Sequence, residues 1–188
     1  MRLSRSAIIA FATLLMAFEK KGGWCQILNL ILIVLLPKAT GGFRPIGLFP
    51  TVIRLWMRAR YGLARAWQAT HSLPVTFGGA GKSAQYAAWQ AAFTAECAAL
   101  MHLDHIQALL DLVKAFETVP HWILARCAAA KGYPAALLRL SLASYRLQRS
   151  IGIAGIQSRL IRATRGITAG AGFATVELEI LLFETIEE

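Results

Sequence analysis

The sequence has few cysteines and few acidic residues. Its three cysteines, Cys25, Cys97 and Cys127, are widely spaced and form no CxxC pair. This pattern indicates neither a disulfide framework nor a cysteine-based structural zinc site. We therefore expect a reducing, intracellular location, in the nucleus or the cytoplasm.

Hydrophobic runs long enough to span a membrane are also missing. The first apolar run, residues 7–18, has 12 residues, whereas a spanning helix needs roughly 20. We predict a buried or amphipathic helix that begins near Ser4 or Ser6. A second run, residues 27–36, is rich in Ile, Leu and Val and stops at Pro37, which predicts a buried strand. No membrane partner is expected.

Acidic residues are scarce in two long parts of the chain. The 20 basic residues outnumber the 10 acidic ones, which gives a net charge of +10. Residues 1–95 contain Glu19 as their single acid, residues 96–117 have a net charge of −3, and residues 118–176 contain no acid. An acidic segment between two basic ones suits a carboxylate metal site within a phosphate-binding surface. Two solvated basic faces would explain the charges equally well.

The length and composition predict one folded domain. A chain of 188 residues with 56% hydrophobic residues can bury a sizeable core, and no repeat or linker divides it. The order of the predicted elements is irregular, which favours an α+β fold over a doubly wound sheet. Besides the first helix and strand, the patterns predict helices over 50–67, 83–101, 121–131, 134–148 and 173–185, a strand over 105–112, and a hairpin over 150–163 with its turn near Gly155.

The strongest motif lies in residues 109–121, which have the sequence LLDLVKAFETVPH. An apolar strand ends here in Asp111. An acid in this position is held rigidly at the rim of a sheet, where it can bind a metal without being buried unpaired. The segment resembles motif A of the reverse transcriptases of non-LTR retrotransposons and group II introns.

Two further segments resemble the same family and occur in the family's order. Residues 35–48, LLPKATGGFRPIGL, look like its fingers motif, and residues 165–175, RGITAGAGFAT, look like a degraded motif B. The resemblance extends over about residues 24–182. It implies one partial reverse transcriptase domain with a right-hand polymerase fold, fingers-like over 24–100 and a partial palm over 101–188, in which an incomplete antiparallel sheet packs with helices.

The resemblance also implies a metal site and partners. In the family, the motif A aspartate and the following backbone carbonyl bind two Mg²⁺ ions, which assigns the metal role to Asp111 and Leu112. Two metals stabilise the attacking and leaving oxygens during nucleotidyl transfer. The implied partners are an RNA template, a DNA primer and deoxynucleoside triphosphates.

Besides Leu112, four other residues match the family's nucleotide-binding positions. Lys38 and Arg44 stand where basic fingers residues neutralise the triphosphate. Phe116 stands where the family keeps a bulky residue under the sugar of the incoming nucleotide, which implies a preference for deoxynucleotides. Gly170 belongs to the glycine-rich turn that supports the template and the incoming nucleotide.

The sequence departs from the family in ways that affect activity. Thr168 and Ala169 replace the usual Pro-Gln of motif B, and Glu117 replaces an aspartate. No aspartate follows Asp111, so the two aspartates of motif C are missing, and we expect the chain alone to be inactive. The alternative hypothesis is a noncatalytic, basic nucleic-acid-binding remnant of the polymerase fold.

Two other motifs are weaker. Residues 78–83, GGAGKS, resemble a P-loop, but Thr76 stands where the first glycine is required. His102 and His105 have a spacing that suits zinc, with His121 or Cys127 as further ligands, although lone histidines near strand ends are usually structural.

Overall fold

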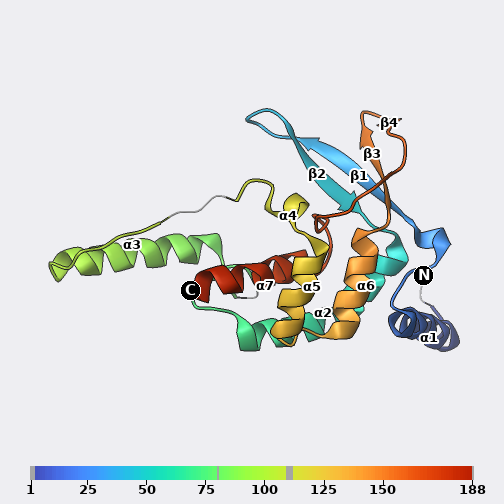
Figure 1. The fold of residues 1–188 in the computed structure, drawn as a ribbon, viewed down its shortest axis with the longest axis horizontal. Helices are drawn as coiled ribbons and strands as arrows, with labels where there is room; N and C mark the ends of the chain where they lie inside the picture. The colour runs from blue at the N-terminus through green and yellow to red at the C-terminus, as the bar shows by residue number, and fades with distance from the viewer. Residues whose placement is uncertain (1–2, 80, 109–111, 188) are drawn as a thin grey trace.

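The computed structural model describes residues 3–79, 81–108 and 112–187. Helices and strands alternate irregularly along the chain (Figure 1). Their order is α1 (Arg5–Lys21), the short 3₁₀ helix η1 (Gln26–Leu28), β1 (Leu30–Pro37), β2 (Phe43–Leu48), α2 (Thr51–His71), α3 (Ala84–Leu100), α4 (Ala115–Thr118), α5 (His121–Ala130), α6 (Ala135–Tyr145), β3 (Gln148–Ile153), β4 (Ile156–Gln157), β5 (Ile161–Arg162) and α7 (Ala174–Glu187).

A small open sheet lies on a layer of helices. Figure 1 shows α2, α5, α6 and α7 packed together below the strands, with α1 at one end and α3 projecting from the other. The α+β class predicted from the sequence is therefore confirmed. Among the described residues, no helix combines the length and hydrophobicity that crossing a membrane requires.

The sheet is mixed, so the prediction of an antiparallel sheet is wrong for its central pair. The strand order is β2-β1-β3-β4, and β5 also pairs with β3. Strand β1 is antiparallel to β2 but parallel to β3, with Ile33 opposite Ile151. The helices between β2 and β3 form a long crossover, and such a connection can return the chain in the same direction, as a tight hairpin cannot.

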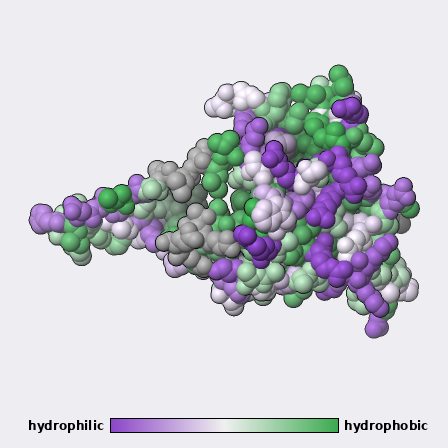
Figure 2. Space-filling model, viewed as in Figure 1, coloured by the Kyte–Doolittle hydropathy of each residue, from purple (hydrophilic) through white to green (hydrophobic). Residues whose placement is uncertain are grey.

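One face of the sheet covers the helices and the other is open. In β1, Ile31 and Ile33 are buried whereas Leu30 and Leu32 are exposed, because successive side chains point to opposite faces. Leucines Leu36 and Leu48 are also about half exposed. Hydrophobic surface is visible over the sheet at the top of Figure 2.

Aromatic side chains fill the core between α1, α2 and the C-terminal half. Trp56 of α2 is fully buried, and its ring makes edge-to-face contacts with Trp24 and Phe173. Its indole Nε1 donates to Glu19 Oε1 at 2.8 Å, and Arg60 donates to the same carboxylate at 2.6 Å. These bonds attach α1 to α2 and lower the pKa of Glu19, chiefly through Arg60.

Most predicted elements are present within a few residues of their expected bounds. The first helix begins after Ser4, whose hydroxyl accepts from the Ala7 N–H at 3.2 Å, and the hairpin turns at Ala154 and Gly155. The prediction of a strand over 105–112 is wrong for residues 105–108, which have no regular structure. Ile106 is 93% exposed, and this segment lacks the neighbouring strand that a backbone ladder requires.

Candidate nucleic-acid interface

The glycine-rich loop, residues 166–172, lies in backbone contact with β2. The Gly47 N–H donates to the Ala169 carbonyl at 2.8 Å. Gly170 has a φ of +102°, and a Cβ atom on it would lie 2.7 Å from the Gly47 carbonyl oxygen. Only glycine combines this backbone conformation with so close an approach.

The same loop is bonded on its other side to α4 and the residues that follow it. The Gly166 N–H donates to the Val119 carbonyl at 2.7 Å, and the Ile167 N–H donates to the Phe116 carbonyl at 2.8 Å. The loop thus joins β2 to α4. The three segments singled out in the sequence, each separated from the next by more than 40 residues, lie next to one another in the fold.

The buried side chain of His121 forms a further contact with the loop. It is 4% exposed, and its Nε2 lies 3.0 Å from the Gly166 carbonyl oxygen. Arg146 Nε donates to Nδ1 at 3.5 Å, so Nδ1 is the acceptor and Nε2 carries the proton. Burial lowers the pKa of His121 against the opposing effect of the Gly166 hydrogen bond, and the charges of Arg146 and Arg149 lower it further. The ring is therefore a neutral structural donor, not a metal ligand.

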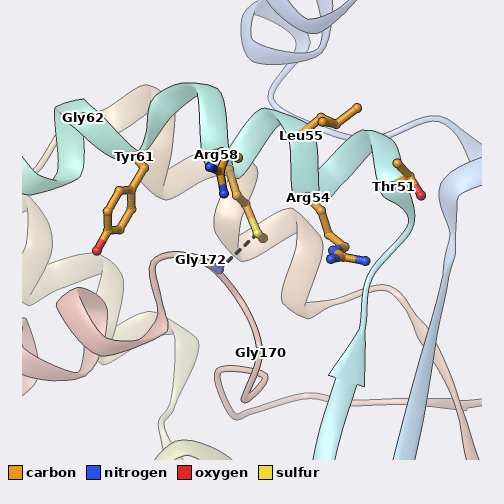
Figure 3. Close-up of a pocket in the computed structure, with 9 residues that line it drawn as sticks. Thr51, Arg54, Leu55, Arg58, Tyr61, Gly62, Gly170 and Gly172 are labelled. Carbon is orange, nitrogen blue, oxygen red and sulfur yellow. Dashed lines mark hydrogen bonds between the residues drawn. The ribbon is translucent and has the colours of Figure 1, made fainter. Parts of the chain in front are cut away.

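An open groove of about 840 Å³ separates the loop from α2. Gly172 comes close to the helix, and its N–H donates to Met57 Sδ at 3.3 Å (Figure 3). The other lining residues lie on α2, except for Gly170 on the loop; those on α2 are Thr51, Arg54, Leu55, Arg58, Tyr61 and Gly62.

The groove has the charge and shape of an anion-binding surface. Arg54, Arg58 and Tyr61 are spaced to share one side of α2, and Figure 3 shows Arg54 and Tyr61 projecting on the side of the loop. Among the described residues, no acid lines the groove. The Arg65 guanidinium, on the same helix, lies 5.8 Å from the centre of the Tyr61 ring and adds a cation beside it. Phosphate groups can lie along such a row of guanidinium groups.

The predicted nucleotide-binding residues are only partly brought together. Gly170 lines the groove, and Phe116 is half-buried against the core beside the loop. Lys38 and Arg44 are exposed at the far end of the β1–β2 hairpin. Arg44 alternates with Gly47 along β2, so it lies on the open face of the sheet while Gly47 faces the loop.

The predicted metal site lies partly outside the described residues. Asp111 lies outside the described residues, and Leu112 is 49% exposed just before α4. Within the described ranges, no group of three or more His, Cys, Asp and Glu residues is arranged to hold a metal ion.

The P-loop-like segment forms part of a polar network. Lys82 Nζ donates to Ser72 Oγ at 2.6 Å and to the Thr76 carbonyl at 2.5 Å. Ser72 and Thr76 in turn donate to the buried carboxylate of Glu179 at 2.9 and 2.8 Å. Gln68 of α2 also donates a hydrogen bond to this carboxylate. Lys82 therefore stabilises the turn after α2 and is not presented to a phosphate.

The sequence contains the arginines of the groove but does not reveal the groove itself. The helical spacing of Arg54 and Arg58 was visible in the sequence, but an ordinary packing helix has the same pattern. The groove depends on a tertiary contact that sequence patterns do not show, because the loop that forms the other wall lies more than 100 residues further along the chain.

No family model matches the chain, and no curated protein matches it.

Proposed function

We propose that this chain is the fingers and partial palm of an RNA-directed DNA polymerase of the non-LTR retrotransposon and group II intron type. The observation that carries the proposal is the contact of residues 35–48, 109–121 and 165–175 around one loop. These segments resemble three family motifs in order, and in a polymerase they would have to meet at one site.

In this proposal, the groove beside Gly170 holds a nucleic-acid strand. Arg54 and Arg58 contact its phosphates, and Tyr61 offers a ring on which a base can stack. Lys38 and Arg44 would contact an incoming triphosphate only if the hairpin that carries them moved toward the loop. Asp111 and Leu112 would bind Mg²⁺, which in the complete enzyme supplies the charge that stabilises the transferring phosphoryl group.

Binding is tested with fluorescently labelled single-stranded RNA of mixed sequence. The double variant Arg54→Ala/Arg58→Ala is expected to bind about tenfold more weakly at low salt. A matched control, Lys20→Ala/Lys21→Ala, removes the same charge from the exposed end of α1 and should change the affinity less than about twofold. Equal losses in both variants, or no binding by the parent chain, would contradict a strand in the groove.

Catalysis is tested after a palm segment with two motif C aspartates is added to the chain. Primer extension with deoxynucleotides and Mg²⁺ is expected, and Asp111→Asn should abolish it because the amide lacks the charge that holds two cations together. Phe116→Ala should retain extension but accept ribonucleotides. An undiminished rate in Asp111→Asn would disprove the metal role.

The noncatalytic alternative is favoured by one observation, the basic lining of the groove, because Arg54 and Arg58 can bind phosphates without a metal ion. It predicts the same RNA binding without primer extension in the extended chain. The two experiments together therefore separate a polymerase part from a binding remnant.

A further inference from the structure

Helix α3 is more exposed to water than is usual for a helix with so few charged residues. It has 17 residues and none of them is buried, although Glu96 is its single charged residue. Figure 1 shows it projecting from the rest of the molecule, with its C-terminal end at the tip. In folded proteins, most of the stability of a helix comes from packing one of its faces against other elements.

A stripe of large apolar side chains runs along α3. Tyr86, Trp89 and Phe93 are 53, 59 and 52% exposed, and Leu100 is 82% exposed. The Tyr86 and Trp89 rings stack with centroids 6.1 Å apart, and the Trp89 and Phe93 rings stack at 5.2 Å. A contiguous aromatic surface of this kind is characteristic of an interaction site.

We infer that α3 is a self-association surface, on which a second copy of the chain docks its own α3 through this stripe. Tyr86, Trp89, Phe93 and Leu100 recur at intervals of three, four and seven residues, the spacing of a helix-pairing seam. Two such helices in antiparallel orientation would place Tyr86 of each copy near Leu100 of the other.

The distribution of charge favours a second copy over nucleic acid. Two chains of net charge +10 repel each other, but α3 contains no Lys or Arg. A helix of this length extends about 25 Å, so an antiparallel pair separates the two basic bodies by more than the Debye length of about 8 Å. Base stacking on the same rings would need nearby cations to hold the phosphates, and α3 instead contains Glu96.

The size of the stripe sets the strength of the pairing. Half-exposed aromatic rings can each bury on the order of 100 Å² more, which with Leu100 amounts to roughly 400 Å² per copy. A stable interface buries about 800 Å² per partner. The expected dimer is therefore reversible, with a dissociation constant of about 10–100 μM.

The test is sedimentation velocity of the full chain between about 1 and 200 μM. The parent chain should shift from monomer to dimer, and Trp89→Ala/Phe93→Ala should weaken this association at least tenfold. Alanine favours the helix, and circular dichroism checks that the helical content is retained. The matched control Trp122→Ala removes a ring that is 66% exposed on α5 and should leave the association unchanged.

Three results would overturn the inference. The parent chain could remain monomeric at the highest concentration, the dimer could persist in the double variant, or the double variant could lose RNA affinity and not dimerisation. The inference does not rest on the proposed function, because Arg54→Ala/Arg58→Ala should dimerise normally whatever its RNA affinity.

Discussion

At the scale of single residues, a buried acid makes stability depend on pH. Glu177 is fully buried in α7 and accepts a hydrogen bond from the Tyr145 hydroxyl at 2.5 Å. Its other oxygen, Oε1, has no hydrogen-bond partner among the described residues. Burial raises the pKa of Glu177 from 4.5 to about 7, against the opposing effect of its hydroxyl neighbours. The folded protein therefore keeps a proton that the unfolded chain has released.

We expect Glu177 to make the free energy of unfolding fall as the pH rises from about 4.5 to 7, by about 3 kcal/mol at most. Its stabilising contribution is complete below the unfolded pKa and is lost as the pH passes the folded one. Urea denaturation at several pH values measures this effect as the difference between the parent chain and Glu177→Gln. His121, whose lowered pKa gives the opposite trend below pH 6.5, is present in both proteins and cancels. Glu96→Gln, on an exposed helix, should keep the parent pH profile, and the same profile in Glu177→Gln would refute the assignment.

Two glycines of the groove should respond in opposite directions to a methyl group. In Gly170→Ala, the new Cβ atom would meet the Gly47 carbonyl in a left-handed backbone conformation, so we expect a loss of about 1–3 kcal/mol. Gly62 lies in α2 with nothing near its Cβ position, and Gly62→Ala should stabilise the helix by about 0.5–1 kcal/mol. Urea denaturation compares them. Equal stability in Gly170→Ala would show that the loop does not need its close contact with β2.

At the scale of elements, the open face of the sheet makes two neighbouring positions of β1 differ in their tolerance of a charged residue. Leu32 is 40% exposed on that face, whereas Ile33 is 7% exposed on the core side. Leu32→Lys should increase the soluble yield because it interrupts an uncovered apolar surface. Ile33→Lys should prevent folding because it buries a charge without a partner. The soluble fraction after expression measures both, and similar yields would mean that the sheet face is covered in solution.

The elements also show which parts of the fold sequence patterns can predict. Helical periodicity predicted α2, α5, α6 and α7 because each has a buried face of its own, and Gly155 correctly predicted the hairpin turn. The parallel pairing of β1 with β3 could not be predicted, because register between distant strands depends on the path of the intervening helices. The strand predicted over 105–112 failed over 105–108 for a related reason, since apolar residues form a strand only beside another one.

The candidate site divides in the same way. Gly170 was predicted from its motif, and the structure gives it a requirement for glycine. The groove that Gly170 lines could be identified only from the three-dimensional structure, because one wall comes from α2 and the other from a loop far along the chain. Lys38 and Arg44 were identified by a local motif, which contains no information on the face of the sheet to which each side chain points.

At the scale of the whole molecule, the excess of positive charge should govern binding to nucleic acid. We expect weak binding to single-stranded RNA or DNA with little sequence preference, weakened by salt. A plot of the logarithm of the affinity against that of the salt concentration should be linear. Its slope should become shallower by about 1.4 in Arg54→Ala/Arg58→Ala, because two phosphate contacts are lost. An affinity independent of salt would exclude binding through phosphates.

The parallel pairing of β1 with β3 has a consequence for how the chain acquires its fold during synthesis. Residues 30–34 of β1 pair with residues 148–152 of β3, and Trp24 donates a hydrogen bond to Ser144. The N-terminal half can form its helices and the β1–β2 hairpin as it leaves the ribosome, but it has no partner for the inner edge of β1 until most of the chain has been made. Closing so long a loop is slow. Through that interval the unpaired edge is open to other chains, so slower translation before residue 148 would prolong the exposure, and a chaperone that shields β1 would act at this stage.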